Sequence, residues 1–238
     1  MQLDLMVMTV HPDDAELGAG GTIAKYVQEG KKVGIVDLTR GELGTRGTAE
    51  TRKQEALRAA EILGVHVREN LELRDGFFQN DENSQLTIIR AIRKYQPEIV
   101  ITNALDDRHP DHGRASKLVN DALFLSGLRR IETFEGNEPQ EAFRPRLQLQ
   151  VIQDKYIQPD IVIDITEYWD IKERSILAYT TQFNSTDTSE PQTYISNPDF
   201  MDSTKGRASE FGRSIQVKYA EGFTARKILG VKDLFQLL

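Results

Sequence analysis

The stretch LDLMVMTVHPDD, residues 3–14, decides the fold, because an apolar run typical of a buried strand ends here in a polar turn. Comparable apolar runs recur at 33–38, 68–73 and 98–102, and longer amphipathic stretches separate them. Alternation of strands and helices predicts a mostly parallel sheet with helices on both faces. Ligands of such α/β folds bind beyond the carboxyl ends of the strands.

Four helices are expected in the first half of the chain, at residues 18–29, 50–63, 84–95 and 111–125. The second half is less regular. It predicts strands at 147–153 and 161–164 and helices at 167–181 and 200–213. The polar stretch 181–200 is expected to be a long surface loop, which could be a lid, an oligomer contact or a plain excursion.

The composition is that of one ordinary globular domain over residues 1–238, with 39% hydrophobic and 28% charged residues. No linker or repeat divides the chain. The absence of cysteine excludes disulfides, iron–sulfur clusters, thiol nucleophiles and cysteine-ligated zinc. Any metal ion must therefore be bound by histidine and carboxylate side chains.

The charge pattern and the amino terminus bear on partners and location. A net charge of −7 without a basic block argues against nucleic acid. The chain opens directly into a strand without a basic leader, and it nowhere has 18 consecutive apolar residues. We therefore expect a cytoplasmic protein without a membrane partner.

Three of the four histidines lie in two tetrapeptides of similar form, HPDD at 11–14 and HPDH at 109–112. Each tetrapeptide follows a predicted strand, so both fall on the carboxyl edge of the sheet. Two distant pieces of the chain are therefore expected to meet at one place. The remaining histidine, His66, is isolated and is expected to be an ordinary side chain.

A catalytic zinc ion needs three ligands from histidine and carboxylate groups, which His11, Asp14 and His112 can supply. Iron(II), cobalt(II) or manganese would suit the same ligands. The neighbouring Asp13 is the candidate general base for a water molecule. His109, three residues before His112, could reach a developing oxyanion or a leaving amine.

Other interpretations of these motifs are open. HPDD could be a turn whose aspartates cap the next helix, and Asp111 or Asp107 could hold the ring of His109. The glycines at 18–21 invite a dinucleotide site, but Ile23 stands where the last glycine of that motif belongs.

A glycine-rich loop at 40–48 could wrap a polar ligand or could simply be a surface loop. Arg52 could clamp a carboxylate or several hydroxyls, or it could cap its neighbours. Arg144 is open to the same two interpretations.

Five segments together resemble the LmbE/PIG-L family of zinc-dependent N-deacetylases: HPDD, LTRGELGTRGT at 38–48, RKQEA at 52–56, DRHPDH at 107–112 and YAEGF at 219–223. The resemblance covers nearly the whole chain, from about residue 3 to residue 223. It implies a Rossmann-like α/β domain. The branch that looks most similar contains the deacetylases of bacillithiol biosynthesis.

The resemblance also implies an activity and its residues. The expected reaction is hydrolysis of an N-acetyl group from an N-acetylglucosamine conjugate, which in that branch is N-acetylglucosaminyl malate. The implied roles are zinc ligands for His11, Asp14 and His112, a general base for Asp13, a carbonyl or amine contact for His109 with support from Asp111, and substrate contacts for Arg52, Arg144, Gly41 and Gly44.

One residue of the resembling proteins is replaced in this chain. Several place a tyrosine near the start of the last helix, where this chain has Phe200, and Tyr194 lies a few residues earlier. Relatives of this branch are often hexameric, so a homo-oligomer such as a hexamer is an expectation. The alternatives are a metal-dependent amidase or esterase on a non-sugar substrate and a sugar- or nucleotide-binding module without catalysis.

Overall fold

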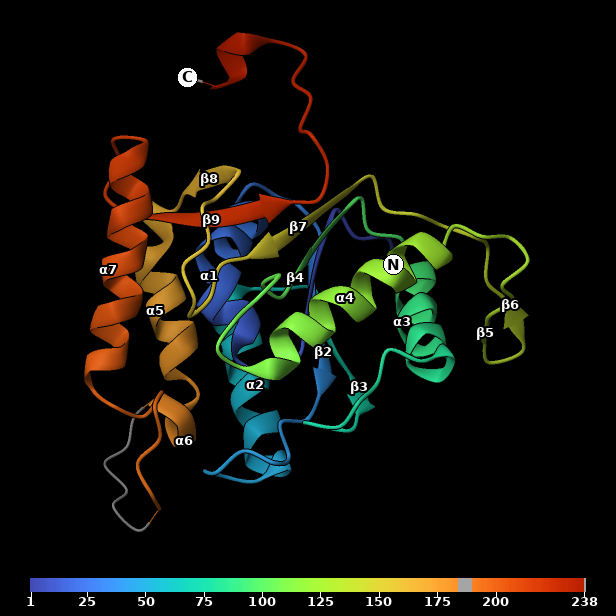
Figure 1. The fold of residues 1–238 in the computed structure, drawn as a ribbon, viewed down its shortest axis with the longest axis horizontal. Coiled ribbons are helices and arrows are strands. Elements are labelled where there is room, and N and C mark those ends of the chain that lie inside the picture. Colours follow the sequence, from blue (N-terminus) through green and yellow to red (C-terminus); the bar gives the residue numbers. More distant parts are fainter. Residues whose placement is uncertain (184–189, 238) are drawn as a thin grey trace.

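The computed structural model describes residues 1–183 and 190–237, which form one layered α/β domain around a seven-stranded sheet (Figure 1). The strand order is β3-β2-β1-β4-β7-β9-β8. The strands are β1 Leu5–Thr9, β2 Val33–Thr39, β3 Val67–Leu73, β4 Ile99–Thr102, β7 Leu147–Val151, β8 Ile161–Asp164 and β9 Ala220–Ala225. Among these described strands, β9 alone runs opposite to the others, so its pairings with β7 and β8 are antiparallel. The predicted mostly parallel sheet is therefore confirmed.

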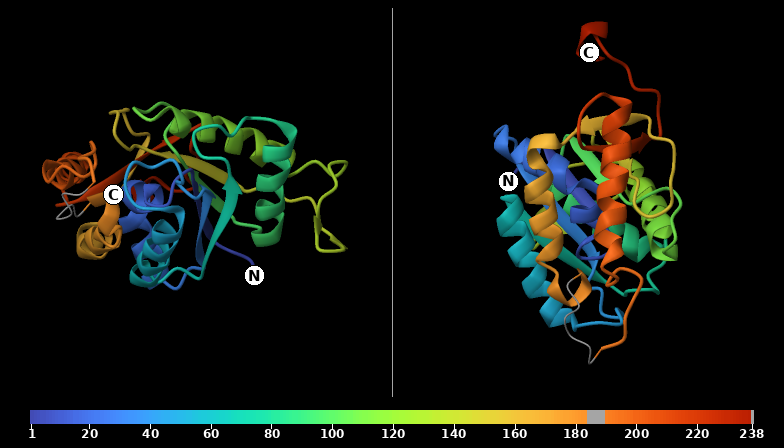
Figure 2. Two further views of the ribbon diagram at one scale, coloured as in Figure 1. Left: turned by 90° about the horizontal axis from the view of Figure 1, so that it is seen from below. Right: turned by 90° about the vertical axis from the view of Figure 1, so that its left-hand side faces the viewer.

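Helices cover both faces of the sheet (Figure 2). They are α1 Asp14–Gln28, α2 Ala49–Leu63, α3 Glu82–Tyr95, α4 Pro110–Leu125, α5 Trp169–Leu177, α6 Thr180–Phe183 and α7 Asp199–Ser214, with short 3-10 turns η1 Thr166–Tyr168 and η2 Leu234–Leu237. A small hairpin, β5 Phe134–Glu135 and β6 Glu138–Pro139, stands apart from the sheet.

The central strand β1 is buried on both faces, which explains its unbroken apolar sequence. Met6 and Met8 belong to the core under α3 and α4, while Leu5 and Val7 belong to the core under α1. Successive side chains of a strand point to opposite faces, so one short run anchors both helical layers. The polar turn after β1 is thereby held at the carboxyl edge of the sheet.

Helix α1 packs against the sheet through its glycines. A Cβ atom on Gly18 would lie 2.7 Å from Val151, and one on Gly21 would lie 2.7 Å from Ile165. The glycine-rich segment thus permits a close approach between helix and sheet. The structure gives these glycines a packing role, in agreement with the failed dinucleotide motif.

The structure differs from the sequence expectations mainly after residue 165. The helix expected at 167–181 is divided into η1, α5 and α6, and the segment at 219–223 contributes to a strand that no alternation pattern indicated. The loop expected at 181–200 is shorter at both ends, because α6 extends to Phe183 and α7 begins at Asp199. Residues 184–189 of that loop lie outside the described residues.

After β9 the chain leaves the domain and ends in η2, away from the sheet (Figure 1). Its apolar side chains are open to solvent, with Ile228 97% and Phe235 78% exposed. Among the described residues, no helix combines the length and the apolar character that a membrane crossing requires.

Candidate active site

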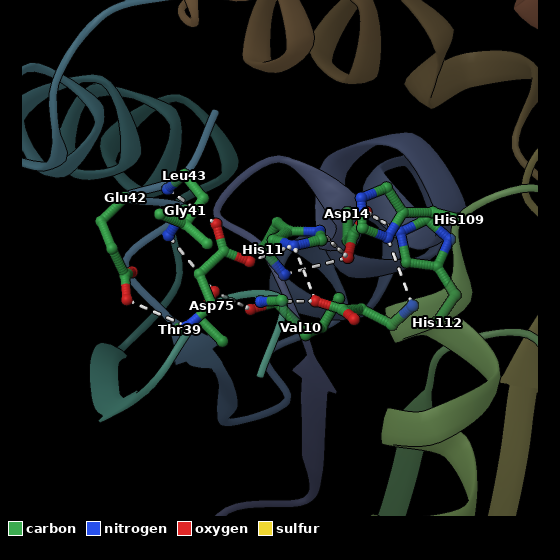
Figure 3. A network of polar contacts seen from close by, with 12 residues as sticks. Val10, His11, Asp14, Thr39, Gly41, Glu42, Leu43, Asp75, His109 and His112 are labelled. Atoms are coloured by element: carbon green, nitrogen blue, oxygen red, sulfur yellow. Dashed lines mark hydrogen bonds and ion pairs between the residues drawn. The ribbon is translucent and has the colours of Figure 1, made fainter. Parts of the chain in front are cut away.

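The two histidine tetrapeptides meet at the carboxyl ends of β1 and β4 (Figure 3). His11 lies in the turn after β1, and Asp14 is the first residue of α1. His109 and His112 lie at the start of α4, where His109 is the N-cap. The ring centroids of His11 and His112 are 5.7 Å apart, and His109 lies within 5.2 Å of both. The convergence of two remote turns is thus present in the fold.

Each of two histidines is oriented by a carboxylate so that its other nitrogen faces Asp14. His112 Nδ1 hydrogen-bonds to Asp107, and its Nε2 lies 3.2 Å from Asp14 Oδ1. His11 Nε2 lies 2.9 Å from Asp75 Oδ1, and its Nδ1 lies 3.6 Å from Asp14 Oδ2. A carboxylate on one ring nitrogen is the usual support of a metal-binding histidine. The donor set of His11, Asp14 and His112 therefore fits a divalent metal ion.

Two amide side chains fix the central carboxylate. Asn103 Nδ2 donates to Asp14 Oδ2 at 3.0 Å, and Gln153 Nε2 donates to Asp14 Oδ1 at 2.8 Å. The backbone N–H of His11 also donates to Asp14 Oδ2. The carboxylate is thus held in one orientation before any ion binds.

The surroundings of these histidines favour positive charge. Burial lowers the pKa of His112, but the charge of Asp14 and the hydrogen bond to Asp107 outweigh it and raise the pKa to about 9. Burial likewise opposes protonation of His11, yet its hydrogen bonds to Asp111, Asp14 and Asp75 hold its pKa well above the ordinary value. Because several carboxylates face few cationic groups here, a divalent ion would be attracted to the same place.

Two groups of described side chains have ligand atoms close enough together to share an ion. Nitrogen atoms of His11, His109 and His112 lie within 4.8 Å of one another, as do atoms of His11, Asp75 and Asp111. The carboxylates of the second group already accept the backbone N–H groups of Leu43 and Gly76. These bonds hold Asp75 and Asp111 in place beside His11.

Asp13 has a strained backbone, with φ 120° and ψ −27°, a region that side chains other than glycine rarely adopt. Arg52 Nη2 lies 2.8 Å from Asp13 Oδ2 and also donates to the carbonyl of Pro12. Burial raises the pKa of Asp13 to about 7, although the charge of Arg52 lowers it. A carboxyl group of this kind can accept and return a proton near neutral pH.

The expected substrate residues Arg52, Gly41 and Gly44 line the same pocket of about 400 Å³. Arg52 is 5% exposed, and its Nε atom has no hydrogen-bond partner among the described residues. A Cβ on either glycine would lie 3.1–3.3 Å from Arg52 or the neighbouring backbone, and Gly41 has φ 63°. The two glycines therefore make room for the guanidinium group.

Arg144 does not lie in this pocket, contrary to the expectation from the sequence. Its guanidinium group packs over the ring of Phe124 at 4.4 Å and donates to the carbonyl of Phe124 at 2.5 Å. Gly127 makes this contact possible, because a Cβ there would lie 2.7 Å from Arg144 Nε. Within one chain, Arg144 is a helix-capping side chain at the end of α4.

The expectation that Asp111 or Asp107 holds the ring of His109 is also wrong. The Asp111 carboxylate accepts the N–H of Gly76 and pairs with Arg114, while only the backbone N–H of Asp111 reaches His109 Nδ1, at 3.3 Å. Asp107 pairs with His112 instead. Both aspartates are nevertheless part of the pocket's polar network.

Sequence reasoning missed several residues of the site. Asp75 orients His11 and accepts the N–H of Leu43, so it joins a histidine of the candidate metal site to the glycine-rich loop. Arg108 and Arg207 line the pocket beside Arg52. The turn after β3 that carries Asp75 follows a strand of the same sheet, which was the one available signal for it.

Comparison with known proteins shows the family to which this chain belongs. Residues 6–123 match the family model described as PIG-L: GlcNAc-PI de-N-acetylase. A diacetylchitobiose deacetylase from Thermococcus kodakarensis is 30% identical over 187 residues, which cover 73% of this chain and 67% of that protein. The chain belongs to the PIG-L family. It is accordingly a deacetylase of that family.

Two further proteins are similar to this chain. A 4-oxalmesaconate hydratase from Pseudomonas putida is also 30% identical, over 74% of this chain and 72% of that protein. The crystal structure of a conserved protein from Thermus thermophilus has a TM-score of 0.86 and 36% identity, with 97% and 98% of the two chains covered. This PIG-L fold is thus shared by proteins that are named for different reactions.

Proposed function

We propose that this PIG-L protein is a zinc-dependent hydrolase that removes the acetyl group from an N-acetylglucosamine conjugate, with N-acetylglucosaminyl malate as the preferred candidate. The arrangement of His11 and His112 around Asp14, each histidine oriented by its own aspartate, carries the proposal. Zinc, when bound there, polarises a carbonyl group and lowers the pKa of water. Iron(II), cobalt(II) and manganese are alternatives for the same ligands.

The protein's own side chains would move the protons. Asp13 would take a proton from the water that attacks the acetyl carbon, because burial raises its pKa to about 7, while Arg52 holds the carboxylate in place. As the C–N bond breaks, the leaving nitrogen needs a proton, which His109 is placed to supply. Burial and the nearby His11 and His112 lower the pKa of His109, so its protonated form is a ready donor.

The sugar conjugate is proposed from both the site and a relative. Arg52, Arg108 and Arg207 are among the residues that line the pocket, and a guanidinium group can bind a carboxylate-bearing aglycone. A Bacillus subtilis protein named probable N-acetyl-alpha-D-glucosaminyl L-malate deacetylase 2 is 27% identical over 76% of this chain and 84% of that protein. These two observations support the malate conjugate, and the diacetylchitobiose deacetylase among the relatives makes an uncharged disaccharide the alternative substrate.

Acetate release tests the proposal. Purified protein loaded with zinc would be assayed with N-acetylglucosaminyl malate, N-acetylglucosamine, diacetylchitobiose and simple N-acetyl amides. We expect the largest kcat/KM for the malate conjugate. Equal rates on simple amides would favour a non-sugar amidase or esterase, and no turnover would favour a binding module.

A hydratase is the second candidate, because a relative of equal identity carries that name. Hydration adds water across a double bond and releases no acetate. Incubation with an unsaturated dicarboxylate, followed by mass spectrometry, would show a gain of one water for a hydratase. The deacetylase proposal expects no mass change in that sample.

We also propose that the chain assembles with further copies of itself. The exposed apolar side chains of the segment after β9, including Ile228, Leu234 and Phe235, support a buried environment in an oligomer. Light scattering would compare the wild type with Leu234→Ser/Phe235→Ser. We expect the variant to form smaller particles, and equal masses would contradict a role of this segment.

A further inference from the structure

A buried ion pair, Lys172 of α5 and Glu221 of β9, lies at the middle of α1 and lines the pocket. The two side chains are 3% and 4% exposed, and Lys172 Nζ lies 2.5 Å from Glu221 Oε1. No proton transfer in the proposed reaction involves them. Their position next to the helix that carries Asp13 and Asp14 needs another explanation.

The pair is bound directly to the backbone of α1. Glu221 Oε1 accepts the N–H of Gly21 at 2.9 Å, and Oε2 accepts the N–H of Thr22 at 2.8 Å. Lys172 Nζ donates to the carbonyl of Leu17 at 2.7 Å. In a regular helix the N–H of Gly21 would bond to that same carbonyl, four residues earlier. The pair therefore enters the hydrogen-bond ladder of α1.

The charges match the polarity of the helix. Carboxylates normally bind free N–H groups at a helix start, and ammonium groups bind free carbonyls at a helix end. Here Glu221 and Lys172 supply both partners in the interior of α1. The contact is possible because residue 20 is glycine, whose added Cβ would lie 3.1 Å from Lys172 Cγ.

The segment of the chain just before the contacts with Lys172 and Glu221 carries the proposed reacting groups. Leu17 accepts the Lys172 ammonium group through its carbonyl, and its own N–H donates to the carbonyl of Asp13 at 3.0 Å. A short chain of bonds thus connects Lys172 to the strained turn of Asp13 and to Asp14. Stability alone does not explain the pair, since a buried ion pair is often replaceable by apolar side chains without loss.

We propose that Lys172 and Glu221 are positioning residues, which hold the first turns of α1 so that Asp13 and Asp14 keep their orientation toward the histidines. This inference rests on the proposed function for its kinetic test. Its second readout, zinc affinity, does not depend on the substrate.

The main test uses the uncharged pair Lys172→Met/Glu221→Gln, which keeps the side-chain lengths. We expect zinc affinity, measured by competition with a chelator, to fall about 10–100-fold, as for other residues that support metal ligands. With zinc saturating, kcat should fall by a similar factor while KM changes little, since misplaced catalytic groups slow the reaction. Thermal unfolding would show that the variant is folded.

A matched control removes the same residue types elsewhere. Lys94 and Glu69 form a pair at 3.1 Å on α3 and β3, outside the pocket. Lys94→Met/Glu69→Gln should keep zinc affinity, kcat and KM. A similar loss in the control would overturn the proposal, because it would show a general effect of removing ion pairs.

Two further variants separate positioning from simple charge pairing. The exchanged pair Lys172→Glu/Glu221→Lys keeps an ion pair but sets the ammonium against N–H groups, so it should not recover zinc affinity or kcat. Full recovery would overturn the proposal. If the charge variants fail to fold, Gly20→Ala provides the test, because its methyl group pushes only on Lys172.

For Gly20→Ala we expect kcat and zinc affinity several-fold below wild type. The proposal would be overturned if a folded Lys172→Met/Glu221→Gln or Gly20→Ala protein had the zinc affinity and kcat of the wild type. A change in KM alone would also overturn it. If no substrate is turned over by the wild type, the proposed function fails, and zinc affinity still decides the role of the pair.

Discussion

Two buried groups of charged side chains flank the first turns of α1, and they are organised differently. The pocket group brings His11 and His112 against Asp14 and faces the cavity. The second group, which we call the arginine cluster, consists of Arg68, Glu16, Asp37 and Tyr179 and does not line the pocket.

In the arginine cluster the donors are matched to acceptors. Arg68 binds both oxygens of Asp37, at 2.8 and 2.9 Å, and Glu16 Oε1 at 2.5 Å. In the pocket group, by contrast, the carboxylate faces histidines, which are cationic only when protonated, and the group opens into the cavity. Similar residue types therefore stabilise the fold where a permanent cation is enclosed, and can receive a metal ion where the partner is a histidine beside a cavity.

The largest expected effect is that of His112→Ala, which removes one ligand of the proposed zinc site. Zinc should be lost on dialysis, and turnover should fall about 10⁴-fold, because polarisation by the metal provides several kcal/mol. Metal analysis and acetate release measure both. The control is His66→Ala, outside the pocket, which should retain zinc. If His112→Ala retained zinc and turnover, the pocket group would not be the metal site, and its contrast with the arginine cluster would fail.

Asp13→Asn should reduce turnover about 10³-fold while the protein keeps its zinc, because the amide cannot accept the proton of water. The substitution preserves shape and the contact region of Arg52. Steady-state kinetics and metal content would be measured together. Asp81→Asn, at the N-cap of α3, is the matched control. Turnover within about twofold of wild type would exclude Asp13 as the base, since loss of a general base costs far more.

Arg68→Met should affect stability rather than zinc binding. It leaves Glu16 and Asp37 buried without their partner, which typically costs about 3–5 kcal/mol. Denaturant unfolding and zinc titration would be compared. Loss of zinc affinity without loss of stability would mean that the arginine cluster serves the pocket directly.

Tyr179→Phe should give the smallest change. The Tyr179 hydroxyl donates to Glu16 Oε1 at 3.1 Å, and Glu16 Oε2 has no hydrogen-bond partner among the described residues. Loss of this donor should cost about 1–2 kcal/mol of unfolding free energy. The value comes from denaturant unfolding. An unchanged midpoint would show that Arg68 alone satisfies Glu16.

The sequence predicted the first half of the fold well, because its strands are short apolar runs and its helices are periodic. The tetrapeptides also indicated where the reacting residues gather, since each follows a parallel strand. Asp75 could not be found this way, as a single aspartate in a turn carries no pattern. Of the two roles open for Arg144, substrate contact or cap, the sequence could not choose, because an arginine near a loop does not reveal whether it faces a pocket or Phe124.

The second half was harder to predict for a different reason. Strand β9 lies between β7 and β8, although it follows both in the sequence, and its Glu221 points into α1. Neither the crossing order nor a buried glutamate bound to helix backbone is visible in periodicity. Such long-range pairings depend on tertiary contacts, which local sequence patterns do not record.

The late position of β9 has a consequence for synthesis on the ribosome. Both histidine turns have been made once residue 112 is translated, more than a hundred residues before β9. Until β9 emerges, β8 has no neighbour in the sheet and Lys172 has no carboxylate partner. In a nascent chain the groups of the proposed metal site can thus come together early. Helix α1, which orients them, is held by Glu221 only after β9 has joined the sheet.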